Sequence, residues 1–432
     1  MTIFSSLNIK EKEAIGLLQV GTFLEYFDFM LYVHMAVLLN ELFFPKVEAH
    51  VSNLISSFAF CSTFIFRPLG ALLFGYIGDT FGRKATVVIT TMAMSMSCVV
   101  MANLPTYSQI GISAAWFITA CRIIQGMSSM GEKTGAELYL TEFIKLPARY
   151  SIVALVEVCA TLGVTCALGV AFLVTSYGFN WRLAFWLGAG VALVGSIART
   201  ALRETPDFID AKRRIEQTLQ EAKYSLKDIE KNHIFKELVN KRTAISYFLI
   251  QLAQPVWFYF VYIHCGNILK NDFNCSSEQI IQQNFVVATI EFISTIIYTC
   301  LAYKIHPLKI ISIKLKISIL FFLICPFLLI NIDTTFGILM IQLFIVTVAP
   351  SAFPAIAVFY KHFPIFKRFT CASLTYAVSR ALMYIITSFG LVYLTKYLSH
   401  WGLLIIVLPI LFGFSLGIFH FQKLEKATGN YH

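Results

Sequence analysis

The sequence predicts an all-α membrane protein with twelve transmembrane helices in two pseudo-symmetric six-helix bundles. The first observation is composition: among 432 residues, 57% are hydrophobic and only 13% are charged, whereas soluble domains carry about 25% charged residues. The second is a mean hydropathy of +0.72. The third is the recurrence of apolar runs long enough to cross ~30 Å of hydrocarbon. Together they exclude an ordinary soluble enzyme and a disordered or collagen-like chain.

Twelve apolar runs have the length of spanning helices. They cover residues 14–40, 51–78, 85–103, 108–135, 150–175, 182–202, 243–268, 279–302, 309–330, 335–360, 369–395 and 399–421. Six runs lie on each side of a charged segment, which predicts an N-terminal bundle over 1–203, a linker over 204–242 and a C-terminal bundle over 243–432. This layout is typical of two-fold-related transporters, in which substrate binds between the halves.

The linker carries one apolar stripe with spacings of three and four residues, formed by Ile215, Leu219, Ala222, Leu226 and Ile229. This periodicity predicts an amphipathic helix. We expect the helix to lie along the cytoplasmic surface, and a docking site for a partner protein is the alternative interpretation.

Lysine and arginine are distributed asymmetrically between the loops. The other loops and the termini hold most of the 34 basic residues, while the outward loops hold only Lys46, Arg182, Lys270 and Lys396. By the positive-inside rule both termini are cytoplasmic. We therefore expect an integral protein of a bacterial inner membrane, in contact with lipid.

Charge and cysteine usage exclude several classes of partner. The net charge of +10 is spread over the ends of apolar runs and the linker, which argues against nucleic acid. Most of the ten cysteines lie in apolar runs without metal-ligand spacing, so we expect no metal. Without a nucleophile–base pattern or a phosphate-binding glycine loop, we expect neither an enzyme nor a cofactor. The chain is expected to act as a monomer.

A turn rich in glycine and charge separates the second run from the third, with the sequence Gly75-Tyr-Ile-Gly-Asp-Thr-Phe-Gly-Arg-Lys84. Its glycines permit a tight turn and close approach of helices. Its acid faces two basic residues across the turn, so the loop can form a compact charge network that joins the bundles in one state and releases them in another. The predicted gating residues are Gly75, Asp79, Gly82, Arg83 and Lys84.

This turn resembles the signature loop of the major facilitator superfamily, although Thr80 stands where that pattern has a basic residue. Other motifs resemble the metabolite:H⁺ symporter family, which includes proline/betaine, α-ketoglutarate, citrate and shikimate permeases. They are Gly21-Thr-Phe-Leu-Glu-Tyr-Phe-Asp-Phe-Met-Leu-Tyr32, Phe66-Arg-Pro-Leu-Gly70, Arg122-Ile-Ile-Gln-Gly126, Trp181-Arg-Leu-Ala-Phe185 and Leu202-Arg-Glu-Thr-Pro-Asp-Phe208. The resemblance implies the major facilitator fold and proton-linked transport of a metabolite. The second-half copy of the turn, near residues 303–309, has lost its glycine and its aspartate.

Ionisable side chains in the N-terminal half form two helical stripes. Each costs at least ~2.5–3.5 kcal/mol to place at membrane depth, which makes it a functional candidate. Glu25, Asp28 and Tyr32 share one face of the first helix, and Arg122 and Gln125 share one face of the fourth. We expect both faces to meet in a central cavity, where the acids and Arg122 neutralise each other. We assign proton coupling to the three charged residues and substrate binding to the other two; a static ion pair is the alternative.

Two further acids lie deep in apolar runs. Glu157 is ~10 Å into the fifth helix from its cytoplasmic end, and Glu291 is near the middle of the eighth. Because lipid exposure is costly, we expect both to face the cavity and predict a role in proton coupling.

The second half offers candidate substrate groups. Arg380 is expected to be its lone deep cation, and a guanidinium binds a carboxylate through two hydrogen bonds. Tyr376 lies one turn away on the same stripe. Pro255, Pro350 and Pro354 are expected within helices, where they permit kinks. An aromatic wall on the seventh helix could hold an ammonium group by cation–π attraction or simply pack; it comprises Gln254, Trp257, Tyr259 and Tyr262.

The sequence therefore predicts a symporter that carries a small carboxylate-bearing or zwitterionic metabolite, such as proline, betaine or a dicarboxylate, together with a proton. The mechanism is alternating access of the two halves. Two alternatives stay open: a proton-independent uniporter or exchanger with the same fold, and a transport-inactive sensor or binding protein of the membrane.

Overall fold

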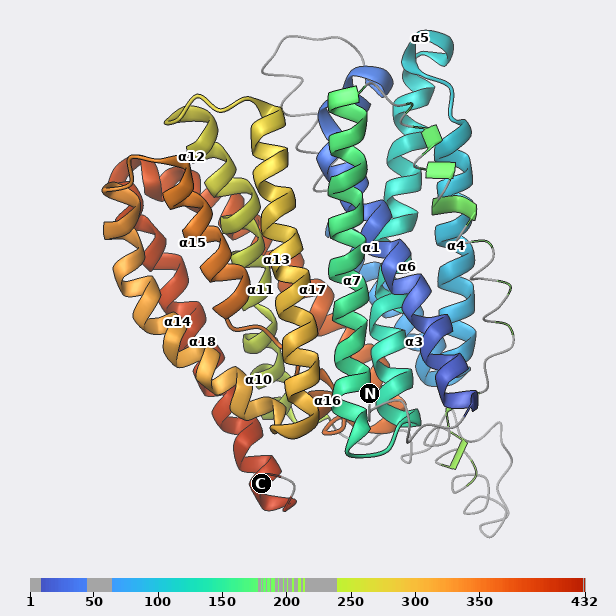
Figure 1. The fold of residues 1–432 in the computed structure, drawn as a ribbon. Coiled ribbons are helices and arrows are strands. Elements are labelled where there is room, and N and C mark those ends of the chain that lie inside the picture. The colour runs from blue at the N-terminus through green and yellow to red at the C-terminus, as the bar shows by residue number, and fades with distance from the viewer. Residues whose placement is uncertain are drawn as a thin grey trace.

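The computed structural model describes residues 9–44, 64–177, 239–429 and 431, with isolated residues between 180 and 213. Almost all of them lie in helices joined by short connections (Figure 1). Part of the predicted run at 51–78, most of the run at 182–202 and the predicted linker helix lie outside the described residues. The domain boundaries stay a prediction.

The described helices of the N-terminal bundle match the predicted runs and extend several of them. They are α1 (Ile9–Phe43), α3 (Arg67–Thr80), α4 (Arg83–Asn103), α5 (Tyr107–Ile110), α6 (Ile112–Phe143) and α7 (Ala148–Tyr177). The C-terminal bundle comprises α10 (Lys241–Gln251), α11 (Ala253–Phe258), the π-helical η3 (Tyr259–His264), α12 (Cys265–Asn271), α13 (Ser277–Lys304), α14 (Pro307–Ile330), α15 (Thr335–Val348), α16 (Ile356–Tyr360), α17 (Ile365–Leu398), η4 (Ser399–Gly402) and α18 (Leu403–Ala427).

Two helix pairs join the bundles. The α7 helix of the N-terminal bundle packs along α13, and α3 packs along α17. In Figure 1 the blue to green helices lie on one side and the yellow to red helices on the other, with α13 and α17 where they meet. The middle of the molecule is therefore bounded by helices of both halves.

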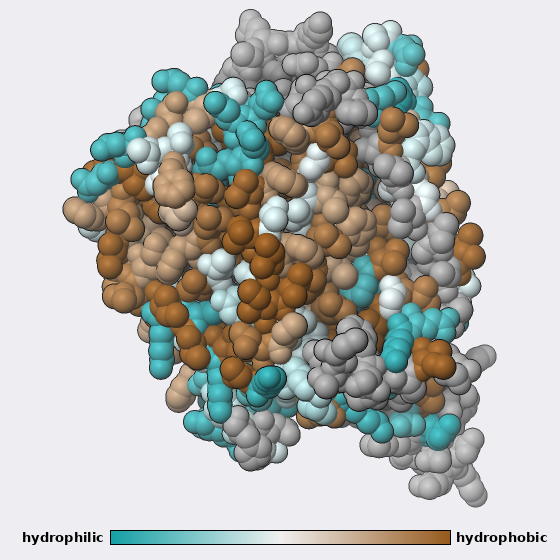
Figure 2. Space-filling model, in the orientation of Figure 1, coloured by the Kyte–Doolittle hydropathy of each residue, from teal (hydrophilic) through white to brown (hydrophobic). Residues whose placement is uncertain are grey.

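Large apolar side chains cover the outside of the bundles. On α14, Ile313, Leu320 and Phe327 are exposed, whereas Ile311 and Phe322 are buried. Figure 2 shows apolar residues over the middle of one face and polar residues toward its two ends. Among the described residues, seven helices are long and apolar enough to cross a membrane. A helical surface of this kind suits lipid, because backbone polar groups are satisfied within each helix.

A proline divides the predicted seventh helix. Pro255 has no N–H to bond the carbonyl of Gln251, where α10 ends. The chain continues as α11, turns through the π-helical η3 and ends as α12. The helix therefore crosses the bundle in short pieces.

The predicted tenth helix is interrupted rather than kinked. It ends as α15 at Val348 and resumes as α16 at Ile356. Pro350 and Pro354 lie in the non-helical segment between, so the prediction that they lie within a helix is wrong. Each proline removes one backbone donor, so two of them four residues apart disfavour a continuous helix here.

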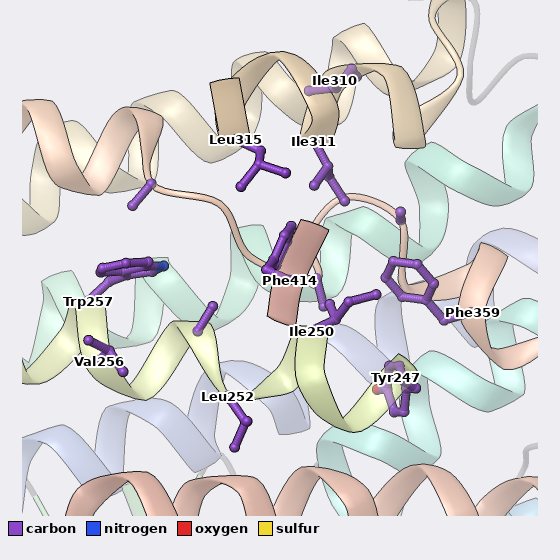
Figure 3. Packing of buried hydrophobic residues seen from close by; sticks show 14 of the residues in the cluster. Tyr247, Ile250, Leu252, Val256, Trp257, Ile310, Ile311, Leu315, Phe359 and Phe414 are labelled. Atoms are coloured by element: carbon purple, nitrogen blue, oxygen red, sulfur yellow. The ribbon is translucent and has the colours of Figure 1, made fainter. Parts of the chain in front are cut away.

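The core of the C-terminal bundle packs around α10 and α11. Tyr247 lies against Phe359 of α16, with ring centroids 5.8 Å apart. Figure 3 shows Ile311 and Leu315 of α14 directed toward the same helix, and Trp257 further along it. Two sequence-distant segments thus pack against the helix that carries the aromatic wall.

Gly163 of α7 lies against the backbone of α1, where a Cβ would clash with the carbonyl oxygen of Phe23. Because backbone atoms of a packed helix yield poorly, we expect Gly163→Ala to lower the free energy of unfolding by about 1–3 kcal/mol. Unfolding of the purified protein in detergent measures this. Gly169→Ala is the control, since its methyl would lie 3.4 Å from the Phe285 ring. Equal stability of the two variants would contradict the close packing of α1 on α7.

Candidate functional site

A cluster of buried charges joins the bundles at the end of the molecule that contains the α3–α4 turn. We call it the gate cluster, and it comprises Asp79, Arg83, Glu142 and Arg368. Arg83 donates from Nε to Oε2 of Glu142 and from Nη2 to Oε1, each at 3.0 Å. Arg368 of α17 donates from Nη1 to Oε1 of Glu142, also at 3.0 Å. One carboxylate of the N-terminal bundle therefore holds one arginine from each bundle.

The turn also binds the backbone of α17 directly. The Asp79 carboxylate accepts the N–H groups of Phe369 and Thr370 at 3.0 and 2.9 Å. Arg83 Nη2 donates to the carbonyl of Ile365 at 2.7 Å, and its guanidinium lies 3.6 Å from Asp79. These contacts hold α3 and α17 together, so this end of the molecule is closed.

Glycines permit this close approach. A Cβ on Gly75 would lie 2.8 Å from the Cα of Thr370. Gly82 has a φ of +116°, which favours glycine. Glu204 accepts the first N–H groups of α4, including that of Lys84 at 3.2 Å. The five residues predicted to gate thus lie at one closed end, Lys84 through its backbone; their role in opening stays a prediction.

The C-terminal bundle has a separate ionic cluster near the C-terminal end of α18. Lys361 Nζ donates to the buried carboxylate of Glu425 at 2.6 Å, and His362 Nε2 lies 2.6 Å from its other oxygen. His306 is 3.7 Å from the same carboxylate. The second-half copy of the signature turn has lost its aspartate, and Glu425 supplies a carboxylate from a different helix.

A cavity of about 450 Å³ lies between the bundles. Its lining includes ionisable and aromatic groups of both halves, among them Glu25, Tyr26, Arg67, Gln254, Tyr376 and Arg380. The hydroxyls of Tyr26 and Tyr376 are 3.1 Å apart and join α1 to α17 across the cavity. Side chains from both halves therefore meet in this cavity.

Arg380 is held in this cavity by neutral groups. Its Nη2 donates to Oε1 of Gln254 at 2.7 Å, and its Nη1 donates to Oε1 of Gln251 at 3.2 Å. Its Cζ lies 3.4 Å from the ring centroid of Tyr376, so the guanidinium stacks on the ring. Within the described part of the chain no carboxylate forms an ion pair with it. The direct partners of this buried positive charge are therefore neutral, and the Glu157 carboxylate interacts with it from beyond Gln254.

The ion pair between Lys133 and Glu157 in the N-terminal bundle is connected to Arg380 through Gln254. Lys133 Nζ lies 2.7 Å from Glu157 Oε2 and 2.8 Å from the hydroxyl of Tyr26. Gln254 donates from Nε2 to the other oxygen of Glu157 at 3.4 Å, while its own oxygen accepts from Arg380. Glu157 thus faces the interface between the halves and contacts both.

Gln125 stands between Asp28 and Arg122. The sequence predicts that the acids and Arg122 neutralise each other; here Gln125 donates to Asp28 through a short hydrogen bond and accepts from Nη1 of Arg122 at 3.0 Å. Glu25 is 4% exposed, and its Oε2 has no hydrogen-bond partner among the described residues. A small cavity of about 200 Å³ is lined by Glu25, Asp28, Arg122 and Gln125. The two predicted stripes therefore meet, with an amide as the bridge.

Another cavity, of about 610 Å³, lies within the C-terminal bundle and reaches Glu157. Its lining includes three predicted residues of the seventh helix, Gln254, Trp257 and Tyr262, and Glu291 of α13. The hydroxyl of Tyr262 donates to Oε2 of Glu291 at 2.7 Å. Tyr259, predicted as part of the same wall, lies in the hydrophobic core cluster. The side chain of Tyr32 lies outside the described residues.

Lys314 of α14 lines this second cavity as well. It is 6% exposed, and its Nζ lies 4.4 Å from the ring centroid of Tyr298. The expectation that Arg380 is the lone deep cation of the second half is therefore wrong. A lysine about two turns into a helix resembles a positive-inside anchor in the sequence, but the buried face of α14 turns it inward.

Sequence reasoning missed several residues of these sites. Arg67 lies inside the apolar run at 51–78, so the cost of an ionisable group at membrane depth was a signal for it. Tyr26 is adjacent to Glu25 and lies off the stripe defined by i, i+3 and i+7 spacing. Glu142 follows the predicted fourth run, and its partners on α17 are more than 200 residues away; no local pattern indicates it.

Glu142→Gln removes the carboxylate charge that holds two buried arginines. Breaking a buried ionic cluster in this way costs about 3–5 kcal/mol, so we expect the closed end to open. Cys371, a half-buried free thiol on α17, reports opening when it is the sole cysteine. Its reaction with a water-soluble maleimide should accelerate in Glu142→Gln and not in Glu13→Gln, at an exposed position of α1. An unchanged rate would contradict the role of the gate cluster.

Sequence comparison identifies relatives. The sequence profile of the Major Facilitator Superfamily matches residues 18–387. A proline/betaine transporter of Salmonella typhimurium is 30% identical over 278 residues, which are 62% of this chain and 55% of that protein. An inner membrane metabolite transport protein of Escherichia coli is 30% identical over 269 residues, 60% of this chain and 58% of that protein. The matched part of the chain thus spans a little over half the length of these curated relatives, which are named as transporters and not as enzymes.

Solved structures share the fold. The proton:xylose symporter XylE bound to 6-bromo-6-deoxy-D-glucose superposes with a TM-score of 0.73 at 17% identity, covering 96% of this chain and 95% of that one. The human organic anion transporter MFSD10 gives a TM-score of 0.65 at 16% identity, covering 95% and 99%. The predicted fold class and the family resemblance are confirmed. The chain is an integral membrane protein that belongs to the Major Facilitator Superfamily.

Proposed function

We propose that the chain is a proton-coupled secondary transporter of a small carboxylate-bearing or zwitterionic metabolite. The observation that carries the proposal is Arg380, a guanidinium 5% exposed in the cavity between the bundles and hydrogen-bonded to neutral amides. A buried charge is costly without a counter-charge. A substrate carboxylate supplies that counter-charge through two parallel hydrogen bonds.

Glu25 supports the proton part of the proposal. It lines the same cavity as Arg380, and one of its oxygens is buried without a hydrogen-bond partner. An ionised carboxylate in that position is poorly solvated, whereas the protonated acid is neutral. Asp28, bridged to Arg122 by Gln125, is the second acid of this face. Substrate charge entering the cavity changes which state each acid prefers.

The names of the relatives favour this class of function. The matches include transporters of proline and betaine, which are zwitterions. We further propose that the protein acts as a monomer in a bacterial inner membrane, with both termini and the gate cluster on the cytoplasmic side. The charge asymmetry of the loops supports this orientation.

Arg380→Gln should abolish substrate recognition by charge. We expect the KM for uptake into proteoliposomes to rise by about 10-fold or more, the loss typical of one charged hydrogen-bonding partner. Arg380→Lys keeps the charge but not the two parallel donors and should fall between. Arg242→Gln, at an exposed position near the start of α10, is the control. Normal KM in Arg380→Gln would refute the carboxylate site.

Glu25→Gln and Asp28→Asn test the proton coupling. In wild-type proteoliposomes an inward proton gradient should accelerate uptake, because the proton moves with the substrate. In the variants we expect uptake to become insensitive to the gradient while counterflow of labelled substrate persists. Wild-type uptake that ignores the gradient would instead identify a uniporter or exchanger, and specific binding without any flux would identify a sensor.

A further inference from the structure

Lys314 and Glu291 face one cavity from neighbouring helices without touching. Glu291 lies near the middle of α13 and Lys314 on the buried face of α14. Both line the cavity within the C-terminal bundle, yet no ion pair within 4.0 Å joins them. The two opposite charges therefore line one cavity without a direct ion pair between them.

No described residue accepts a hydrogen bond from the ammonium group of Lys314, which lines the cavity. Within the described residues its one direct contact is the face of the Tyr298 ring, 4.4 Å from Nζ to the centroid. An ammonium has three donors, and burying them unpaired is costly. A carboxylate arriving from the cavity would satisfy them, whereas a cation would be repelled.

Other residues that line the cavity suit a cation. One oxygen of Glu291 accepts from Tyr262, which leaves the other oxygen for a ligand. The rings of Trp257, Phe258 and Tyr262 line the same space, and aromatic faces attract cations. A dicarboxylate would bring its second charge toward Glu291, so this wall discriminates against it.

Along α13 the cavity face is continuous. Glu291, Ser294, Thr295 and Tyr298 are spaced i, i+3, i+4 and i+7 and all line the cavity. The neighbouring central cavity shares Gln254 and Phe258 with it. A ligand in the second cavity thus lies beside the one that contains Arg380, but meets a different cation.

We propose that this cavity is a second binding centre for a zwitterionic metabolite, whose carboxylate binds Lys314 and whose cationic group faces Glu291 and the aromatic rings. The proposal rests on the proposed function as a metabolite transporter and adds a site and a charge preference to it. Lys314 is then a specificity-determining residue, and substrates with both charges are favoured over substrates with one.

The test combines variants that lack one charge of the site with ligands that lack one charge of the zwitterion. Binding of L-proline, L-prolinamide and N-acetyl-L-proline to the purified full-length chain in nanodiscs is measured by titration calorimetry. In wild type, the zwitterion should bind at least about 10-fold more tightly than either analogue. Lys314→Met should lose the one binding site whose preference for the zwitterion over the amide depends on Lys314, and the site that contains Arg380 should keep its own. Glu291→Gln should lose the preference of the second centre for the zwitterion over the N-acetyl form. Lys316→Met, an exposed position on the same helix, should behave as wild type.

Thermal unfolding without ligand separates binding from structure. The Lys314 ammonium has no hydrogen-bond acceptor among the described residues, so its removal breaks no hydrogen bond. We therefore expect the Tm of Lys314→Met to equal or exceed that of wild type. If Lys314→Met fails to fold, Lys314→Arg provides the second variant, and it should retain the charge preference. A lowered Tm with unchanged ligand discrimination would overturn the proposal and assign Lys314 to structure.

The remaining outcomes distinguish this inference from the proposed function. Loss of zwitterion binding in Arg380→Gln, with no effect of Lys314→Met, would overturn the second centre and leave the transporter proposal standing. Binding of dicarboxylates such as succinate with no zwitterion binding would do the same. A wild-type chain that binds and transports none of these compounds would overturn both.

Discussion

An ionised side chain inside a membrane protein has little water to solvate it, so other protein groups must hold its charge. In this chain the clearest case is Glu142, whose carboxylate accepts hydrogen bonds from Arg83 of its own bundle and Arg368 of the other. If the bundles separate at this end, Arg368 loses its hydrogen bond to Glu142 and Arg83 loses its hydrogen bond to the carbonyl of Ile365. The closure of one end of the molecule therefore depends on pairing between buried charges.

In the middle of the molecule, several buried charges are hydrogen-bonded to neutral groups instead of being directly paired with opposite charges. Arg380 is held by two amides and a ring, and Asp28 meets Arg122 through Gln125. Such neutral partners orient a charge without cancelling it. In our proposal the substrate and the proton complete these incomplete pairings, and the gate cluster responds because α17 carries both Arg380 and Arg368.

Periodicity along single helices predicted much of the site. The stripes on the first and fourth helices meet as expected, because i, i+3 and i+7 spacing fixes a face irrespective of the partner. Choices of partner across the bundles were not predictable in the same way. In the sequence Lys314 resembles an interfacial anchor, and only the packing of α14 shows that it is buried. Glu142 lies in α6 but beyond the end of the apolar run that predicted this helix.

For the backbone too, local sequence predicted some features, whereas others depend on tertiary contacts. Lengths of apolar runs predicted the helices well, and hydropathy sufficed for the lipid-facing surface. The interruption between α15 and α16 was not predicted, because a proline can kink a membrane helix or end it. Here Trp257 donates to the carbonyl of Pro350 at 2.7 Å, and this tertiary contact satisfies a backbone group of the non-helical segment.

The central claim is that paired charges across the bundles hold one end closed until substrate and proton occupy the middle. The most direct measurement is the distance between spin labels at Leu146 and Lys304, exposed positions next to α7 and at the end of α13, by double electron–electron resonance in nanodiscs. The account predicts a short distance without substrate and a growing long-distance population when substrate is added at low pH. A distribution that stays the same under both conditions, in a protein that transports, would contradict it.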